Sequence, residues 1–329
     1  MSLLLPDASD IAAAVAALHR GELIGLPTET VYGLAGDARN PSAIRGIFAT
    51  KGRPADHPLI VHVADATQIA QWAREIPDSA MQLARAFWPG PMTLILKKAA
   101  SVNALVTGGQ DSIGLRIPRH PLALAVLREF GGGLAAPSAN RFGHVSPTTA
   151  QHVRDEFGDT VPIVLDGGAC AIGIESTIID LGHGTPRILR PGQIGKAAIV
   201  AVIGEVAEGP REDSPRVSGA LASHYAPRTP TERLSRTRLV ARWKQCHEDG
   251  ETALALSIGA LPPGVDGIAL PDDPEGYARH LYAALRSLDA EGADRILVER
   301  IPQADAWRAI DDRLQRAASH SDSPLESAG

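Results

Sequence analysis

Hydrophobic residues in the first 205 positions form short runs separated by longer stretches of mixed character. The short runs predict strands at 23–26, 59–63, 92–96, 113–117, 163–165, 178–181 and 187–189. The stretches between them predict helices at 65–75, 78–87, 120–130 and 148–157. Strands and helices interleaved in this way predict a mixed α/β domain.

Two helices near the N-terminus carry clear start and stop residues. Ser9 and Asp10 are the candidate N-caps of an Ala-rich helix that stops at Gly21. Asn40 is the candidate N-cap of a second helix, and Pro41 takes its first position, where proline is well tolerated.

The C-terminal part alternates more regularly. It predicts strands at 253–258 and 295–299, a helix at 275–288 between them and a last helix at 304–318, which together indicate a small doubly wound α/β domain. Residues 208–219 are rich in Pro, Gly, Ser and charge, as is typical of a linker. The predicted division is a catalytic domain at 1–205, a linker or lid at 206–232, a C-terminal domain at 233–318 and a disordered tail at 319–329.

Composition narrows the class of protein. With 44% hydrophobic and 21% charged residues among 329, fibrous and disordered classes are excluded for most of the chain. Asp7 and Asp10 stand where a signal peptide would be basic and apolar, so a soluble cytoplasmic protein is expected. Two cysteines exclude a disulfide framework, and the formal charge of -6 gives no general attraction to nucleic acid.

Common catalytic signatures are missing. The chain has no GxxxxGK[ST] loop, GxSxG elbow, HExxH or GxGxxG. Polar residues instead gather among Gly and Pro in five places: LPTETVYGL at 26–34, KGRPADHPLIVH at 51–62, SIGLRIP at 112–118, AAPSANRFGHVS at 135–146, and GIESTII at 173–179 with RILRPG at 187–192. Function is therefore expected to come from loop residues.

Each segment, taken alone, allows two interpretations. In the first, Thr28 or Thr30 could line a ligand site or cap a turn. In the second, Lys51 and Arg53 could clasp an anion or form a solvated charge cluster. Arg116 lies on a half-buried strand, so either a protein carboxylate or a ligand must meet it.

The fourth and fifth segments are equally open. Ser138 and Asn140 follow a strand and could donate to phosphate or ribose oxygens, or form an ordinary turn. The fifth segment adds further hydroxyl groups and an arginine before a Pro-Gly turn.

Taken in order, the motifs PTETVYGL, KGRP with PLIVH, FWPGPMTL, IGLRIP, APSAN with SPT, IESTIID and ILRPG closely resemble the YrdC-like threonylcarbamoyl-adenylate synthases, from about residue 23 to 192. The added C-terminal domain, joined through SHYAP at 223–227, resembles the long two-domain form of that family. The resemblance implies a twisted mixed-sheet N-terminal domain and a smaller Rossmann-like C-terminal domain.

The resemblance also implies an activity. Such enzymes are nucleotidyltransferases that make L-threonylcarbamoyl-AMP from L-threonine, bicarbonate or CO2 and ATP, and release pyrophosphate. Mg²⁺ would arrive with ATP, and no organic cofactor is expected. A downstream tRNA threonylcarbamoyl transferase complex would use the product for the N6-threonylcarbamoyladenosine modification beside the anticodon, and a weak contact with tRNA is conceivable within that pathway. No membrane partner is implied.

Site residues follow from positions in the family pattern. The reactive centre would comprise Lys51, Arg53, Ser138 and Asn140. The threonine side would comprise Thr30, His62, Arg116, Ala136 through its backbone, and Ser176. The ATP side would comprise Arg53, His57, Ser112, Ser138, Ser146 and Arg190, with Tyr225 closing over the nucleotide from the linker. His57 departs from the asparagine that is common in the family.

Three alternatives stay open. The protein could be an RNA-binding or assembly factor without adenylate synthesis, although its near-neutral first domain lacks aromatic stacking motifs. It could belong to the related enzymes that make carbamoyl-adenylate, but their zinc-finger and acylphosphatase segments do not occur in the sequence. Tyr225 could also simply dock the linker onto one domain.

Overall fold

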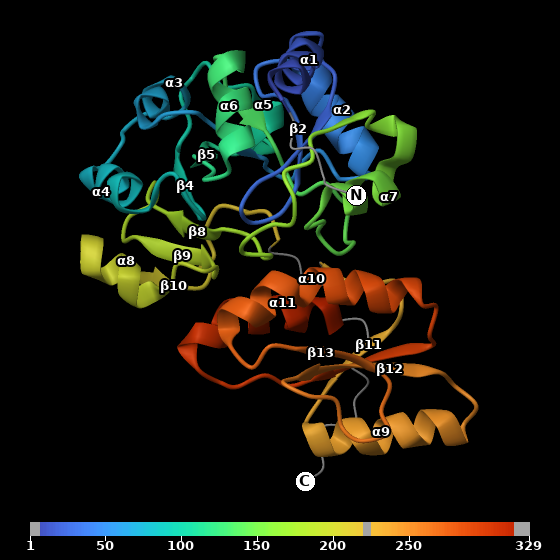
Figure 1. The fold of residues 1–329 in the computed structure, drawn as a ribbon. Helices are drawn as coiled ribbons and strands as arrows, with labels where there is room; N and C mark the ends of the chain where they lie inside the picture. Colours follow the sequence, from blue (N-terminus) through green and yellow to red (C-terminus); the bar gives the residue numbers. More distant parts are fainter. Residues whose placement is uncertain (1–6, 220–224, 319–329) are drawn as a thin grey trace. The chain divides into compact units, whose positions relative to one another are not determined.

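The computed structural model describes residues 7–219 and 225–318 (Figure 1). These residues form two compact units, one from 7–142 with 146–219 and one from 143–145 with 225–318. Residues 206–219 of the predicted linker thus belong to the first unit. Ser223 and His224 of the predicted junction, and the tail at 319–329, lie outside the described residues.

The first unit contains a ten-stranded mixed sheet. Its strands, in spatial order, are β10 (Ala207–Glu208), β9 (Arg187–Arg190), β8 (Thr177–Asp180), β4 (Met92–Lys97), β5 (Ser112–Arg116), β3 (Ile60–His62), β6 (Leu134–Ala135), β2 (Gly33–Asp37), β1 (Ile24–Leu26) and β7 (Ile163–Val164). Parallel pairs such as β3 with β5 and antiparallel pairs such as β4 with β5 coexist. The predicted mixed α/β fold is confirmed.

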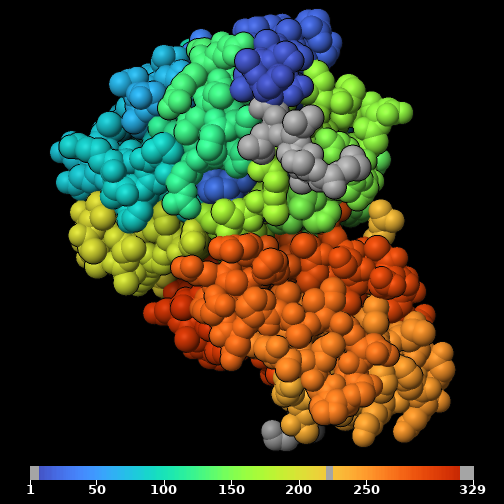
Figure 2. Space-filling model, in the orientation of Figure 1, coloured from blue at the N-terminus to red at the C-terminus, as the bar shows by residue number. Residues whose placement is uncertain are grey.

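Helices cover this sheet. They are α1 (Ala8–His19), α2 (Pro41–Lys51), α3 (Ile69–Trp72), α4 (Asp78–Phe87), α5 (Ala104–Thr107), α6 (Pro121–Phe130), α7 (Ala150–Phe157) and α8 (Lys196–Ile203). Helices α1 and α6 pack together over one apolar cluster of the core. Helix α4 packs against α8, and their surfaces adjoin in the space-filling view (Figure 2).

The structure corrects two predicted helix boundaries. Helix α1 begins one turn early because Asp7, rather than Ser9 or Asp10, is its N-cap and accepts from the backbone N–H of Ser9 at 2.7 Å. The helix predicted at 65–75 is a 3-10 turn (Ala66–Gln68) followed by the short α3, because Ala73 turns extended and pairs with Lys98. The Asn40 cap of α2 is confirmed.

The second unit is built on a parallel sheet. Strands β11 (Thr231–Leu234), β14 (Arg295–Glu299), β12 (Ala253–Ile258) and β13 (Gly267–Leu270) lie in that order. Helix α9 (Arg236–Glu248) lies on one side of the sheet, and α10 (Pro274–Ala290) and α11 (Arg308–Ala318) on the other (Figure 1). This confirms the doubly wound domain. Within residues 7–219 and 225–318, no helix combines the length and apolar character needed to span a bilayer.

Candidate active site

Two polar segments that are distant in sequence lie against each other in the first unit. The backbone N–H of Ala139 donates to the carbonyl of Tyr32 at 2.8 Å, and Gly33 pairs with Ser138 in an isolated antiparallel bridge. A Cβ atom at Gly33 would lie 3.2 Å from the Cβ of Ala136, so this close approach favours glycine. The PTETVYGL and APSAN motifs therefore lie side by side in the first unit.

Lys51 connects helix α2 to the APSAN motif. It is the last residue of the helix, which ends because Gly52 takes a left-handed conformation with φ 61°. Its Nζ donates to the carbonyl oxygens of Ser138 and Asn140, both at 2.5 Å, and the side chain is buried. An ammonium has three hydrogens, so one remains for a ligand. Burial, and secondarily the Arg53 cation, hold the pKa of Lys51 well below its usual range.

Arg116 ends strand β5 in a buried ion pair. Its Nη2 lies 2.8 Å from Oε1 of Glu29, its Nη1 donates to Thr30 Oγ1 at 2.9 Å, and its Nε donates to the carbonyl of Gly90 at 3.2 Å. Oε2 of Glu29 accepts from the backbone N–H of Arg119 at 3.0 Å. Of the two partners that the sequence left open for Arg116, the structure therefore shows a protein carboxylate.

His62 lies beside Arg116, with which it is paired in the register of β3 and β5. The imidazole is 3% exposed, and burial, followed by the Arg116 cation, lowers its pKa to about 3. Across the described residues, its Nδ1 finds no hydrogen-bond partner. A neutral ring nitrogen is therefore available to a ligand. Ala136 follows the neighbouring β6, where its N–H donates to the carbonyl of Ile60 at 3.1 Å.

Ser176 connects the two predicted subsites. Its Oγ lies 2.8 Å from Thr93 Oγ1 and accepts from Nη2 of Arg190 at 3.1 Å. Arg190 also donates through Nε and Nη2 to the Ser176 carbonyl, at 3.1 and 3.0 Å. A residue predicted on the threonine side thus contacts an arginine predicted on the ATP side.

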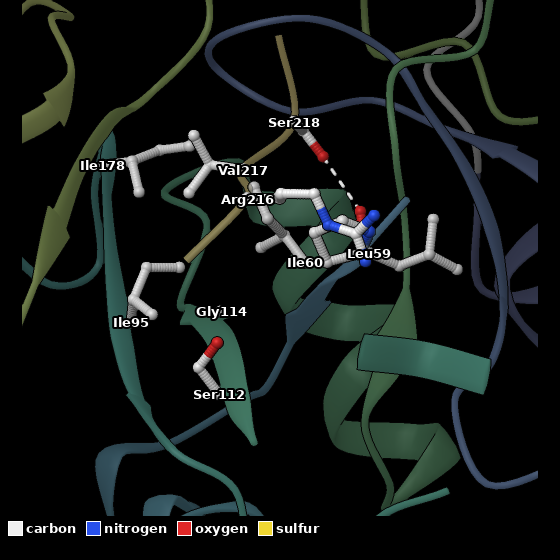
Figure 3. A pocket seen from close by; sticks show the side chains of 10 residues that line it. Leu59, Ile60, Ile95, Ser112, Gly114, Ile178, Arg216, Val217 and Ser218 are labelled. Atoms are coloured by element: carbon white, nitrogen blue, oxygen red, sulfur yellow. Dashed lines mark hydrogen bonds between the residues drawn. The ribbon is translucent and has the colours of Figure 1, made fainter. Parts of the chain in front are cut away.

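Ser218, in the segment 216–218, contacts both arginines that were predicted on the ATP side. Nη2 of Arg53 donates to Ser218 Oγ at 3.1 Å, and Nη1 of Arg190 donates to the Ser218 carbonyl at 2.9 Å. The Ser218 hydroxyl in turn donates to the carbonyl of Pro58 at 3.1 Å, the dashed line in Figure 3. Ser218 therefore links Arg53 to Arg190 through hydrogen bonds.

A small pocket of ≈ 10 Å³ lies beneath this segment (Figure 3). Its walls include the apolar side chains of Ile60, Ile95 and Ile178, and Ser112 supplies a hydroxyl. Val217 packs with the isoleucines in a small buried cluster. The pocket is therefore mainly apolar and has room for about one water molecule while Val217 and Ser218 line it.

Ser146 and His57 occupy the same unit but make separate contacts. The hydroxyl of Ser146 donates to Oε1 of Glu175 at 2.7 Å, and both side chains are buried. The His57 ring meets the edge of Phe142 with centroids 5.3 Å apart, and burial, then Arg53, lower its pKa. The backbone N–H of Phe142 also donates to the carbonyl of Lys51 at 2.8 Å, which places His57 near the Lys51 cluster.

Tyr225 belongs to the second unit. Its ring lies 5.8 Å from that of Tyr282 and 5.4 Å from the guanidinium carbon of Arg313, and it adopts a positive φ of 62°. These are packing contacts within that unit, and the contact of Tyr225 with ATP remains a prediction.

Sequence reasoning missed four partners of the site, namely the buried Glu29, Thr93 and Glu175 and the partly buried Ser218. Glu29 and Glu175 could have been identified from the sequence, because each is the only charged residue in a motif of small and apolar residues. A carboxylate buried in such a motif needs a partner. No group of three His, Cys, Asp or Glu that could hold a metal ion occurs within 7–219 and 225–318.

Family models match nearly the whole chain. One described as "Telomere recombination", for Sua5, YciO and YrdC, matches residues 16–192, and one described as "Threonylcarbamoyl-AMP synthase, C-terminal domain" matches residues 194–319. The resemblance seen in the motifs is thereby confirmed.

Individual relatives agree along their full length. The threonylcarbamoyl-AMP synthase of Pyrococcus abyssi is 38% identical over 317 residues, covering 92% of each chain. That of Bacillus subtilis is 38% identical over 322 residues, covering 94% of this chain and 92% of its own. The crystal structure of P. abyssi Sua5 complexed with L-threonine superposes with a TM-score of 0.89 at 37% identity and 94% coverage of both chains. This chain therefore belongs to the threonylcarbamoyl-AMP synthase family of enzymes, in its long two-domain form.

Proposed function

We propose that this enzyme converts L-threonine, bicarbonate and ATP to L-threonylcarbamoyl-AMP, pyrophosphate and water. The observation that carries the proposal is the contact of Ser176, predicted on the threonine side, with Arg190, predicted on the ATP side. Arg190 and Arg53 both donate to Ser218, and Arg116 and Thr30 form a separate polar cluster in the same unit. The threonine complex of P. abyssi Sua5 supports an amino-acid subsite in a chain of this fold.

The threonine subsite would centre on Arg116. A guanidinium has five N–H groups; Nε and Nη1 of Arg116 donate to Gly90 and Thr30, and Nη2 lies against Glu29 in an ion pair, which leaves one N–H on Nη1 and one on Nη2 beyond these contacts. The other two suit the α-carboxylate of threonine as a bidentate pair. His62 would offer its neutral Nδ1, and Ala136 and Ser176 would border the same subsite.

The chemistry needs no protein nucleophile. The threonine amine adds to CO2 derived from bicarbonate and loses a proton, giving a carbamate. A carbamate oxygen then forms a bond to the α-phosphorus of ATP, and the bond to the β-phosphate oxygen breaks and releases pyrophosphate. Lys51, Arg53 and Arg190 would neutralise the phosphates, and Ser138 and Asn140 would orient the reacting groups. Positioning of this kind can supply about 7 to 11 kcal/mol of a barrier.

The nucleotide would lie along the other cluster. Its base would lie against Ile95 and Ile178 in the place that Val217 and Ser218 take in this structure, with Ser112 at the wall. The hydrogen of Ser146 is donated to Glu175, so Ser146 would accept from a ribose hydroxyl rather than donate to phosphate. Mg²⁺ would enter as the ATP complex, with His57 and Tyr225 as further nucleotide contacts. The product would serve a cytoplasmic tRNA threonylcarbamoyl transferase for N6-threonylcarbamoyladenosine.

Pyrophosphate release tests the proposal. The full chain is incubated with Mg-ATP, bicarbonate and one amino acid at a time, and threonine-dependent release is expected. Arg53→Ala should abolish it, whereas Arg242→Ala, which removes an ion pair with Glu232 in the second unit, is the matched control and should retain it. Release without threonine dependence, or none with the wild type, contradicts the proposed reaction.

A further inference from the structure

Thr30, which the proposed function places in the threonine subsite, makes two side-chain hydrogen bonds. Its Oγ1 lies 2.9 Å from Nη1 of Arg116 and 2.9 Å from Oγ1 of Thr28. Arginine has only donors, so Thr30 accepts from Arg116. Both threonines are buried, at 0% and 1% exposure. The direction of the bond between the two hydroxyls then decides what Thr30 can offer a ligand.

The surroundings of Thr28 fix that direction. Its hydroxyl donates to the backbone carbonyl of Val31 at 2.5 Å. A hydroxyl has one hydrogen, so toward Thr30 it can only accept. The backbone N–H groups of Thr30 and Val31, each 3.2 Å from the same oxygen, share one of its two lone pairs, and the other lone pair accepts from Thr30. Thr30 therefore donates to Thr28.

We propose that Thr28 sets Thr30 as a hydrogen-bond acceptor for the side-chain hydroxyl of the amino-acid substrate. The hydrogen of Thr30 is committed to Thr28 and one lone pair to Arg116, which leaves one lone pair for the ligand. The substrate hydroxyl suits this fixed acceptor because it keeps its hydrogen from substrate to product, whereas the amine loses hydrogens as the carbamate forms. Thr28 is thus a positioning residue for recognition of a β-hydroxy amino acid, an inference that rests on the proposed function.

The test compares threonine with O-methyl-L-threonine, which keeps the side-chain oxygen but cannot donate. Thr28→Val keeps the shape of the side chain but frees the hydrogen of Thr30, and Thr28→Ser keeps the hydroxyl. Thr231→Val is the matched control, because Thr231 is also buried and its hydroxyl donates to the carbonyl of Thr229 in the second unit. For each variant, kcat/KM is measured with both amino acids, KM with ATP, and the melting temperature.

Wild type, Thr28→Ser and Thr231→Val should all prefer threonine strongly. In Thr28→Val this preference should shrink about tenfold, because Thr30 can now donate to the ether oxygen, while KM for ATP changes less than twofold. The steric cost of the methyl group is common to all variants and cancels in the comparison. An unchanged preference in a folded Thr28→Val, or loss of preference in Thr28→Ser, overturns the inference. Absence of threonine-dependent turnover in the wild type would instead refute the proposed function.

Discussion

The ion pair between Arg116 and Glu29 allows fold and function to be separated by a double-mutant cycle. The Arg116 and Glu29 side chains are 5% and 4% exposed, so removing one leaves the other charged group buried and unpaired. Breaking a buried pair in this way costs about 3 to 5 kcal/mol. Arg116→Met and Glu29→Leu should therefore each lower the free energy of unfolding of the first unit by that amount.

The double variant should lose far less than the sum of the single variants. It removes both charges and takes one hydrogen bond from each of three polar groups, the Thr30 hydroxyl, the Gly90 carbonyl and the Arg119 N–H. At about 1 kcal/mol each, the double variant should be destabilised by roughly 3 kcal/mol, which gives a coupling energy of at least about 3 kcal/mol.

Denaturant unfolding measures these values in a background that carries Trp243→Phe and Trp307→Phe. Tryptophan fluorescence then reports only on the first unit, through Trp72 and Trp88. Single variants that each lose less than about 1 kcal/mol, or a double variant whose loss equals their sum, would refute the buried-pair argument.

Threonine titration of the folded double variant completes the test. If Arg116 holds the substrate carboxylate, affinity should fall at least thirtyfold, corresponding to about 2 kcal/mol or more. A double variant that binds threonine like the wild type would move Arg116 to a purely structural role while leaving the ion-pair energetics intact.

Three further outcomes are expected. His62 is buried neutral with a pKa of about 3, against an ordinary value of 6.5, so only the unfolded chain takes up its proton between these pH values and stability falls as pH drops. From pH 6.5 to 5 the wild type should lose about 1.6 kcal/mol more than His62→Gln in denaturant unfolding, and equal losses would contradict this. The pKa of Lys51 is lowered, and a bound anion would raise it. ATP binding should therefore be accompanied by proton uptake at alkaline pH, which calorimetry detects as a binding enthalpy that depends on the buffer. Lys51→Met should show no such proton uptake. Val217→Asp should weaken ATP binding more than tenfold without changing threonine affinity, because it places a carboxylate against the apolar pocket. Unchanged ATP affinity would contradict the proposed position of the base.

Local sequence predicted the fold well where a strand or helix is decided by its own residues. The runs at 92–96, 113–117 and 253–258 are buried strands, and the Asn40-Pro41 start fixed α2. The helix predicted at 65–75 was wrong because an extended Ala73, paired with Lys98 far along the chain, overrides helical spacing. Long-range pairing of this kind has no local signature.

The same distinction applies to the candidate site. The motifs identify which residues could carry chemistry, but the partners of those residues come from elsewhere in the chain. Segment 208–219 has linker composition, yet β10 pairs with β9 and Ser218 contacts Arg53 across 165 positions. Glu29 stands next to Thr30 in the sequence, but its pairing with Arg116 depends on how β5 is placed in the sheet.

Arg116 and Lys51, two of the buried cations of the candidate site, are held in different ways that suit different substrates. Arg116 is paired with Glu29, so its immediate surroundings are close to neutral, which suits a zwitterionic amino acid that brings one charge of each sign. Lys51 has the carbonyls of Ser138 and Asn140 as its hydrogen-bond acceptors within the described chain, and carbonyls orient an ammonium without cancelling its charge. Burial raises the free energy of an ammonium held this way, which is why the pKa of Lys51 is lowered. A bound polyanion would stabilise the charged form. The pairing of each cation therefore supports the proposal that Arg116 holds the amino acid and Lys51 the triphosphate.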